Sequence, residues 1–154
     1  MRRLFPLLVA LSLTACLNLN VDAPTAANNP SDPTTETFAS SLNINIATMQ
    51  KTASGVFFKD TTVGSGDLLT SQTRVVASYL LLLKTGAPVG QSVNQTIDLT
   101  IQPVGFRDGV VGMRVGGERI LVVPSALGYG PCTDLPGIPP NSTLIFDVKL
   151  NLIP

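Results

Sequence analysis

Hydrophobic and polar residues alternate along several short segments of this chain, and such alternation predicts half-buried β-strands. In the first of these segments Leu42, Ile44 and Ile46 alternate with asparagines. Residues 73–83 are apolar at nearly every position, which indicates a central strand covered on both faces. The expected strands cover residues 42–46, 56–61, 73–83, 97–101, 119–123 and 143–153.

One segment has the period of a helix instead. Phe106, Val110 and Met113 recur at the spacing that places three side chains on one helical face. Glycines within and around this segment make it a poor helix in isolation, so packing against a sheet must hold it. The pattern predicts an α+β fold, an antiparallel β-sheet wrapped around one short α-helix.

The N-terminus has the features of an export signal. Arg2 and Arg3 precede an apolar run over residues 4–13, too short for the roughly 20 residues that span a bilayer. Residues 1–15 are therefore predicted to be a signal peptide. Cys16 follows small residues and resembles the lipidated cysteine of bacterial lipoproteins, which implies attachment to a membrane on its extracytoplasmic side; an ordinary signal peptide with an incidental cysteine is the alternative.

Residues 16–41 are rich in Asn, Pro, Thr and Ala and have no apolar period. Such a segment buries too little surface to offset the entropy of ordering. We therefore expect a lipidated cysteine and disordered tether over residues 16–41, followed by one domain over residues 42–154.

Composition excludes several classes of function. Lysine and arginine together number ten, as do aspartate and glutamate, which gives no electrostatic footprint for nucleic acid. The absence of histidine excludes Ser-His-Asp and Cys-His catalysis and disfavours a zinc site. No metal or cofactor is expected. Three arginines are expected to be solvated: Arg107, Arg114 and Arg119.

The C-terminal third carries several motifs in a fixed order. Gly-Met-Arg-Val-Gly-Gly-Glu-Arg occupies residues 112–119, Gly-Tyr-Gly residues 128–130, and Gly-Ile-Pro-Pro-Asn-Ser-Thr-Leu-Ile-Phe-Asp-Val-Lys-Leu residues 137–150. This order resembles the FKBP-type peptidyl-prolyl isomerases, strongly at the C-terminus and loosely between residues 80 and 106. The resemblance implies the FKBP fold, proline-containing polypeptides as partners, a role in folding exported proteins and, by expectation, a monomer.

The resemblance also implies a pocket that binds the twisted X-Pro amide. Its catalytic positions map to Tyr79, to Phe106 (where the family usually has tryptophan), to Tyr129, to Ile138 and to Phe146. Tyr79, Phe106 and Phe146 equally suit a hydrophobic core. Tyr129 lies between two glycines, a setting that favours a cleft.

Three substrate-binding positions depart from the family. Val89 replaces a pocket phenylalanine, and Gly90 replaces an aspartate. Pro103 stands where a backbone N–H contacts substrate, and proline has none. A one-residue insertion would align Gln102 there instead, and the sequence leaves both alignments open. These departures leave two interpretations: an active isomerase, or a weakly active module that binds proline-containing chains.

Overall fold

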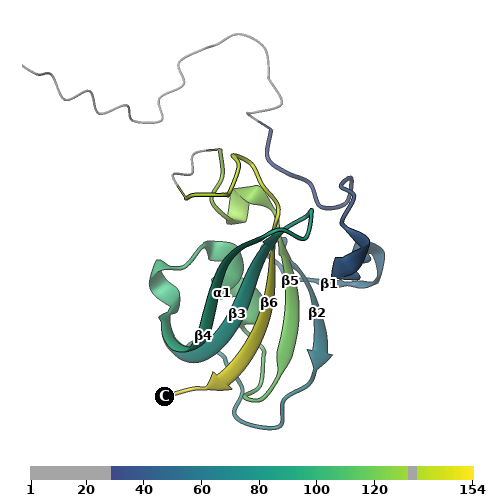
Figure 1. Ribbon diagram of the computed structural model, residues 1–154. Coiled ribbons are helices and arrows are strands. Elements are labelled where there is room, and N and C mark those ends of the chain that lie inside the picture. The colour runs from purple at the N-terminus through teal and green to yellow at the C-terminus, as the bar shows by residue number, and fades with distance from the viewer. Residues whose placement is uncertain (1–28, 132–134) are drawn as a thin grey trace, which may run out of the picture.

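The computed structural model describes residues 29–131 and 135–154, and its strands form one six-stranded sheet in the order β1-β2-β5-β6-β3-β4. Every neighbouring pair is antiparallel, and the helix α1 packs against one face of the sheet (Figure 1). The predicted α+β fold is therefore confirmed. The elements are β1 Gln50–Lys51, β2 Phe57–Thr62, β3 Arg74–Leu83, β4 Pro88–Asp98, α1 Val104–Val110, β5 Glu118–Val123 and β6 Leu144–Leu152.

The sheet buries apolar side chains on both faces, although the second face is apolar at one end only and carries Glu118, Asp147 and Lys149 at the other. On one face β3 contributes Val75 and Leu81 to the main core, which also contains Phe106 of α1. On the opposite face Leu82 packs against a second cluster around Val122. β3 also pairs with β4 and β6, so it is an interior strand, as expected. Its second face is covered only in part, because Val76, Ser78 and Leu80 are half-buried.

The helix lies unusually close to β5. A Cβ atom on Gly105 would overlap Val123, and one on Gly109 would come within 2.8 Å of Leu121. The glycines that weaken the helix in isolation are thus what allow it to approach the sheet. Phe106 and Val110 are buried from α1, and Met113 is buried just beyond its end.

The strand predicted over residues 42–46 does not form. The segment contains a 3-10 turn at Ser40–Leu42 and another at Ile46–Thr48. Between them Asn43 has φ 53°, a left-handed conformation that interrupts a strand. Leu42, Ile44 and Ile46 all pack against the second cluster. The alternation correctly identified which side chains pack inward, where they are half-buried, but not the conformation of the backbone.

The chain before residue 42 also packs on the domain. Ser31 and Ser125 exchange two hydrogen bonds of 2.8 Å, and Phe38 packs against the second cluster. The tether prediction is therefore wrong over residues 29–41, because paired polar groups and one aromatic side chain order the segment. The predicted signal peptide, Cys16 and the first part of the predicted tether lie outside the described residues.

The strand predicted over residues 97–101 is the end of a longer strand. β4 runs from Pro88 to Asp98, and residues 99–101 form a 3-10 turn. The Asp98 carboxylate caps this turn by accepting from the Thr100 N–H at 2.9 Å. Most β4 side chains before Ile97 are exposed or half-buried, so the first part of the strand carries no apolar alternation.

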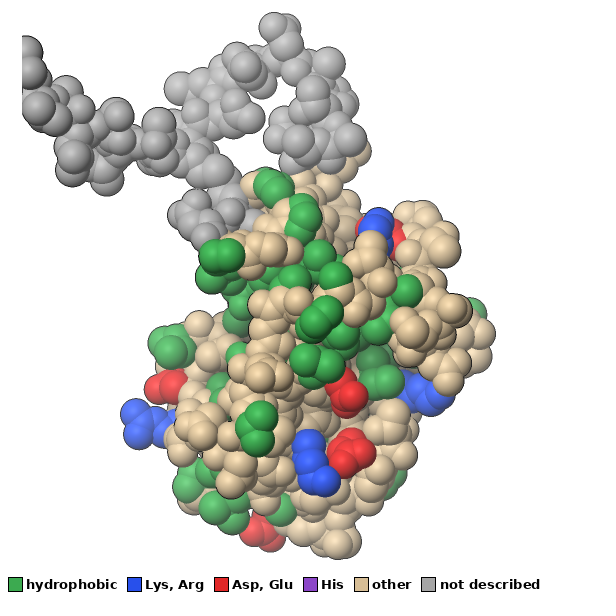
Figure 2. Space-filling model, in the orientation of Figure 1, with side chains coloured by type: hydrophobic (Ala, Val, Ile, Leu, Met, Phe, Trp, Pro, Cys, Tyr) green, Lys and Arg blue, Asp and Glu red, His purple; other side chains and the backbone are tan. Residues whose placement is uncertain are grey.

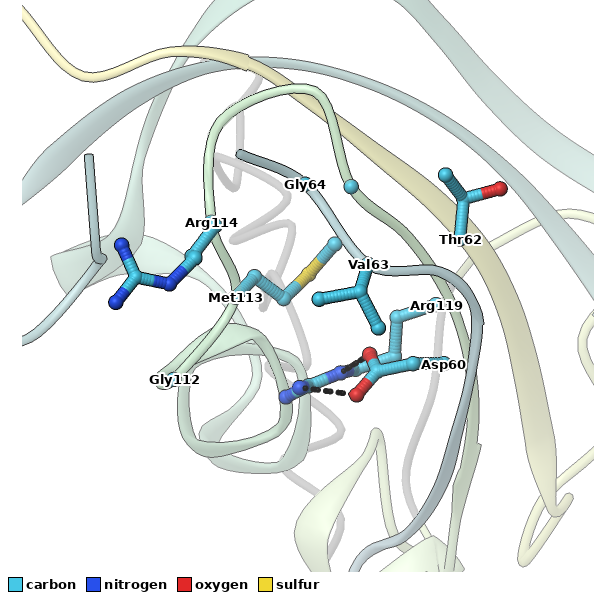
Figure 3. Close-up of a pocket in the computed structure, with 9 residues that line it drawn as sticks. Asp60, Thr62, Val63, Gly64, Gly112, Met113, Arg114 and Arg119 are labelled. Carbon is cyan, nitrogen blue, oxygen red and sulfur yellow. Dashed lines mark hydrogen bonds and ion pairs between the residues drawn. The ribbon is translucent and has the colours of Figure 1, made fainter. Parts of the chain in front are cut away.

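Arg119 is buried, and its predicted solvation is wrong. Its guanidinium makes two hydrogen bonds to the Asp60 carboxylate, of 2.6 and 3.1 Å (Figure 3). It also donates to the carbonyls of Gly109 and Val111 at the end of α1, at 2.9 and 3.0 Å. The adjoining hollow measures only about 80 Å³, so we assign this pair the structural role of attaching α1 to β2 and β5.

No helix within the described ranges has both the length and the apolar character needed to cross a bilayer.

Candidate functional site

Three aromatic rings from separate elements form one cluster on the face of the sheet that carries α1. The ring centroids of Tyr79 and Phe106 are 5.5 Å apart, those of Tyr79 and Phe146 5.8 Å, and those of Phe106 and Phe146 5.0 Å. These separations and tilted orientations are those of favourable aromatic contacts. The structure thus brings together side chains from β3, α1 and β6.

Tyr79 is the most exposed ring of this cluster, and Tyr129 packs against the same core. Phe106 has no exposed surface and Phe146 is 3% exposed, whereas Tyr79 and Tyr129 are half-buried. Burial raises the pKa of Tyr129, and the neighbouring Tyr79 raises it further. The Tyr129 hydroxyl therefore stays protonated at neutral pH and is able to donate a hydrogen bond.

Tyr129 owes its position to a turn that follows β5. Pro124 ends the strand and opens a 3-10 turn over Ser125–Leu127. The Gly130 N–H then donates to the Ser125 carbonyl at 2.9 Å, and Gly130 adopts φ 64°. This left-handed residue turns the backbone immediately after Tyr129.

Ile138 and Val89 complete the apolar surroundings of the rings. Ile138 is 7% exposed and belongs to the main core, and Val89 packs against the same core. The two segments lie close together, because a Cβ atom built on Gly137 would be 3.6 Å from Val89 Cγ1. Val89 therefore lies beside the loop that carries Ile138. It belongs to the first part of β4, which the sequence analysis did not predict as a strand.

The family's substrate-contacting N–H maps to Pro103 in one alignment and to Gln102 in the other. Neither residue has an unpaired backbone N–H. Pro103 has no N–H and precedes α1 directly, where its carbonyl accepts from the Arg107 N–H at 3.1 Å. The Gln102 N–H donates to the Leu99 carbonyl at 3.4 Å. Gly90 pairs with Leu81 in the sheet and has no side chain to replace the family's aspartate.

Sequence reasoning missed two members of the site's surroundings, Leu81 and Leu83. Leu81 pairs with Gly90 on one side and with Phe146 on the other, so it lies directly beside the rings. Leu83 packs on the same core. Their alternation with Tyr79 was visible in the sequence and was the signal that could have identified them.

Burial and the neighbouring Glu118 raise the pKa of Asp147 on β6. Within residues 29–131 and 135–154, no three His, Cys, Asp or Glu side chains come together as a metal site requires.

Comparisons with known proteins agree with this geometry. The model of the family described as FKBP-type peptidyl-prolyl cis-trans isomerase matches residues 66–151, more than half of the chain. FK506-binding protein 4 of Gibberella zeae is 39% identical over 126 residues, which cover 79% of this chain and 25% of that protein. The chain therefore spans about a quarter of the length of that curated relative.

Two solved bacterial structures are similar in fold. A peptidyl-prolyl cis-trans isomerase from Pseudomonas syringae pv. tomato aligns with a TM-score of 0.62 and 28% identity, over 67% of this chain and 78% of that one. FkpA from Escherichia coli aligns with a TM-score of 0.61 and 31% identity, over 67% of this chain and 50% of that one. The match of the family model, the shared fold and the aromatic cluster together show that this chain belongs to the FKBP-type peptidyl-prolyl cis-trans isomerase family.

Proposed function

We propose that this protein is a peptidyl-prolyl cis-trans isomerase that binds proline-containing polypeptides over the cluster of Tyr79, Phe106, Tyr129, Ile138 and Phe146. The observation that carries the proposal is the contact of three aromatic rings from β3, α1 and β6, with Tyr129 and Ile138 packed in the same core, in a chain of this family. Rotation of a peptide bond has a barrier of about 18–20 kcal/mol. Lowering it requires preferential binding of the twisted amide, without a nucleophile.

The surroundings of the rings suit that task. A twisted amide is less polar than a planar one, so apolar walls bind the transition state better than the ground state. The protonated Tyr129 hydroxyl donates to a carbonyl of the bound chain and fixes its orientation. Each 1.36 kcal/mol of selective binding raises the rate about tenfold.

The departures at three positions predict a lowered rate. Neither Pro103 nor Gln102 offers a free N–H to the substrate, and Val89 presents less apolar area than phenylalanine. One lost hydrogen bond and a smaller wall together remove about 1–3 kcal/mol of transition-state binding. The expected catalyst is therefore slower than a family member with the complete pocket.

A protease-coupled isomerisation assay on a short X-Pro peptide tests the proposal. The protein should accelerate isomerisation in proportion to its concentration. Tyr129→Phe should lower kcat/KM by about fivefold to tenfold, the effect of one hydrogen bond. Glu118→Gln, on the sheet surface, is the matched control and should leave the rate unchanged.

A second candidate function follows from the same departures. Without the N–H and the carboxylate, the module would bind proline-containing chains as a chaperone or adaptor with little turnover. Isomerisation no faster than in buffer, together with measurable peptide binding, would establish this function and exclude the first.

We also propose that the protein is exported, lipid-anchored through Cys16, monomeric, and assists the folding of exported proteins. The sequence of residues 1–16 supports the export and the anchor, and the family supports the monomer and the role in folding. Mass spectrometry of the protein from membranes of a bacterial host tests the anchor. A mature N-terminus at Cys16 with acyl chains is expected, and a soluble product with an unmodified cysteine would contradict it.

A further inference from the structure

Two segments that are far apart in the sequence are joined at the end of β5. The backbone N–H of Ser31 donates to Ser125 Oγ, and the backbone N–H of Ser125 donates to Ser31 Oγ, both at 2.8 Å. Ser125 has no exposed surface, and Ser31 is half-buried. Buried polar groups are nearly always paired, and the partner of the buried Ser125 N–H comes from a residue 94 positions away.

Ser125 also fixes the turn that carries Tyr129, which we call the Tyr129 turn (residues 125–130). The Ser125 carbonyl accepts from the Gly128 N–H at 3.0 Å and from the Gly130 N–H at 2.9 Å. These two glycines are the residues on either side of Tyr129 in the sequence. A displacement of Ser125 therefore moves the backbone on both sides of Tyr129.

The segment that carries Ser31 is attached to the domain at its other end as well. The Ala39 N–H donates to the Lys84 carbonyl at 2.8 Å, and Lys84 Nζ donates to Glu36 Oε1 at 2.8 Å. Between these contacts and Ser31, Pro33 is buried. In Figure 1 the segment starts near the loops at the upper end of the sheet and runs towards the side of β1. A segment held at both ends gives Ser31 a fixed position from which to hold Ser125.

We infer that Ser31 is a positioning residue for isomerisation, which acts through Ser125 to hold Tyr129 in place. The inference rests on the proposed function for the role of the Tyr129 hydroxyl as a donor to the bound chain. Ser31 lies outside residues 66–151, which match the family model. The functional unit of this chain therefore extends beyond the part that the family shares.

The physical reason is that a hydrogen-bond donor favours the transition state only when it is already oriented. Without the hydroxyl of Ser31, the N–H of the buried Ser125 has no acceptor at the observed position of the turn. An unpaired buried donor is costly, so the turn shifts to find another acceptor or water. The bond from the Ser31 N–H to Ser125 Oγ remains in such a variant, and the effect on Tyr129 is therefore partial.

The first test measures isomerisation of a short X-Pro peptide by variants of the full chain. Ser31→Ala should lower kcat/KM by about threefold to fivefold, less than Tyr129→Phe does, because the Tyr129 hydroxyl is still present but less well placed. Ser31→Thr keeps the Oγ acceptor and should retain the rate of wild type. The matched control is Ser40→Ala, which removes a hydroxyl from an exposed position of the same segment and should leave the rate unchanged. A Ser31→Ala variant as fast as wild type would overturn the inference.

A double variant separates positioning of Tyr129 from a general effect on the fold. Combined with Tyr129→Phe, Ser31→Ala should cause no further loss of kcat/KM, because the hydroxyl that it positions is absent. A further loss of threefold to fivefold in the double variant would show that Ser31 acts independently of Tyr129. That result would overturn the inference and leave the proposed function intact.

The pKa of Tyr129 tests the inference without any isomerase activity. The chain has two tyrosines, so NMR of protein with ¹³C-labelled tyrosine follows both during a pH titration, and Tyr129→Phe assigns them. Burial raises the pKa of Tyr129 above its usual 10.0. Ser31→Ala should lower this pKa towards 10.0, because a displaced turn admits water to the ring, and Ser40→Ala should not change it. An unchanged pKa in Ser31→Ala would overturn the inference, whereas a wild type without isomerase activity would refute the proposed function alone.

Hydrogen exchange of wild type keeps the inference testable if Ser31→Ala does not fold. The amide hydrogens of Ser125 and Gly130 should exchange about as slowly as those of β5, because the paired serines hold the turn closed. Rapid exchange at Ser125 would show that the pair with Ser31 opens readily and would overturn the inference.

Discussion

Thr143→Val should make the protein more stable, although it replaces a residue in the core. The side chain is 1% exposed and its hydroxyl has no hydrogen-bond partner in the described part of the chain. An unsatisfied buried polar group costs about 1–3 kcal/mol, and valine has nearly the same shape. A domain of this size shifts its Tm by about 4 °C per kcal/mol, so the expected rise is about 4–12 °C.

Thermal and urea unfolding of wild type, Thr143→Val and Thr143→Ser provide the assay. The serine variant keeps the hydroxyl and loses a methyl group, so it should lose roughly 1 kcal/mol. Thr96→Val, at an exposed position of β4, should change the free energy of unfolding by less than about 0.5 kcal/mol. A Thr143→Val variant less stable than wild type would show that the hydroxyl is paired in solution and would refute the reasoning.

Three further substitutions test the packing and the charges of the fold. Gly105→Ala should destabilise by about 1–3 kcal/mol, because the new methyl group overlaps Val123 and this outweighs the gain in helix propensity. Breaking a buried ion pair lowers the free energy of unfolding by roughly 3–5 kcal/mol. Arg119→Met should lower it by an amount near the lower end of that range, because the Asp60 side chain is 29% exposed. Asp147→Asn should raise stability at pH 7, because burial raises the pKa of this carboxyl above its usual 3.8 and so disfavours the ionised form; the gain should vanish once the pH falls below that value.

Urea unfolding measures all three effects. Gly90→Ala is the control for the first, because its Cβ would lie at an ordinary 3.7 Å from Leu81. A Gly105→Ala variant as stable as wild type would contradict the close helix–sheet contact. An Arg119→Met variant within 0.5 kcal/mol of wild type, roughly the size of a surface effect, would contradict the structural role of the pair. For Asp147→Asn, an equal gain at pH 3.5 and pH 7, on either side of the carboxyl's usual pKa, would show that charge is not the cause.

The low charge of the protein is visible on its surface. In Figure 2 hydrophobic side chains gather below the loops at the upper end of the sheet, and most charged side chains on this face lie as neighbours of opposite sign. This distribution gives no continuous surface of one charge on the face shown.

The sequence alone determined the fold class and the membership of the aromatic cluster. Short segments rich in apolar residues located β2, β3, β5 and β6, because each strand buries at least one face. The helical spacing of Phe106, Val110 and Met113 gave the buried face of α1. The ordered motifs gave the family, and with it the residues whose rings meet.

Tertiary structure decided what local pattern does not encode. Residues 42–46 alternate as a strand does, yet no sheet edge is paired to them, and a left-handed Asn43 turns the chain instead. Arginine is usually found at the surface. Arg119 is buried because its guanidinium is paired with the Asp60 carboxylate and with backbone carbonyls of α1. Ser31 and Ser125 exchange two hydrogen bonds although they are 94 positions apart, and no local signal links them. Contacts of this kind depend on how distant segments pack, so only the folded chain brings them together.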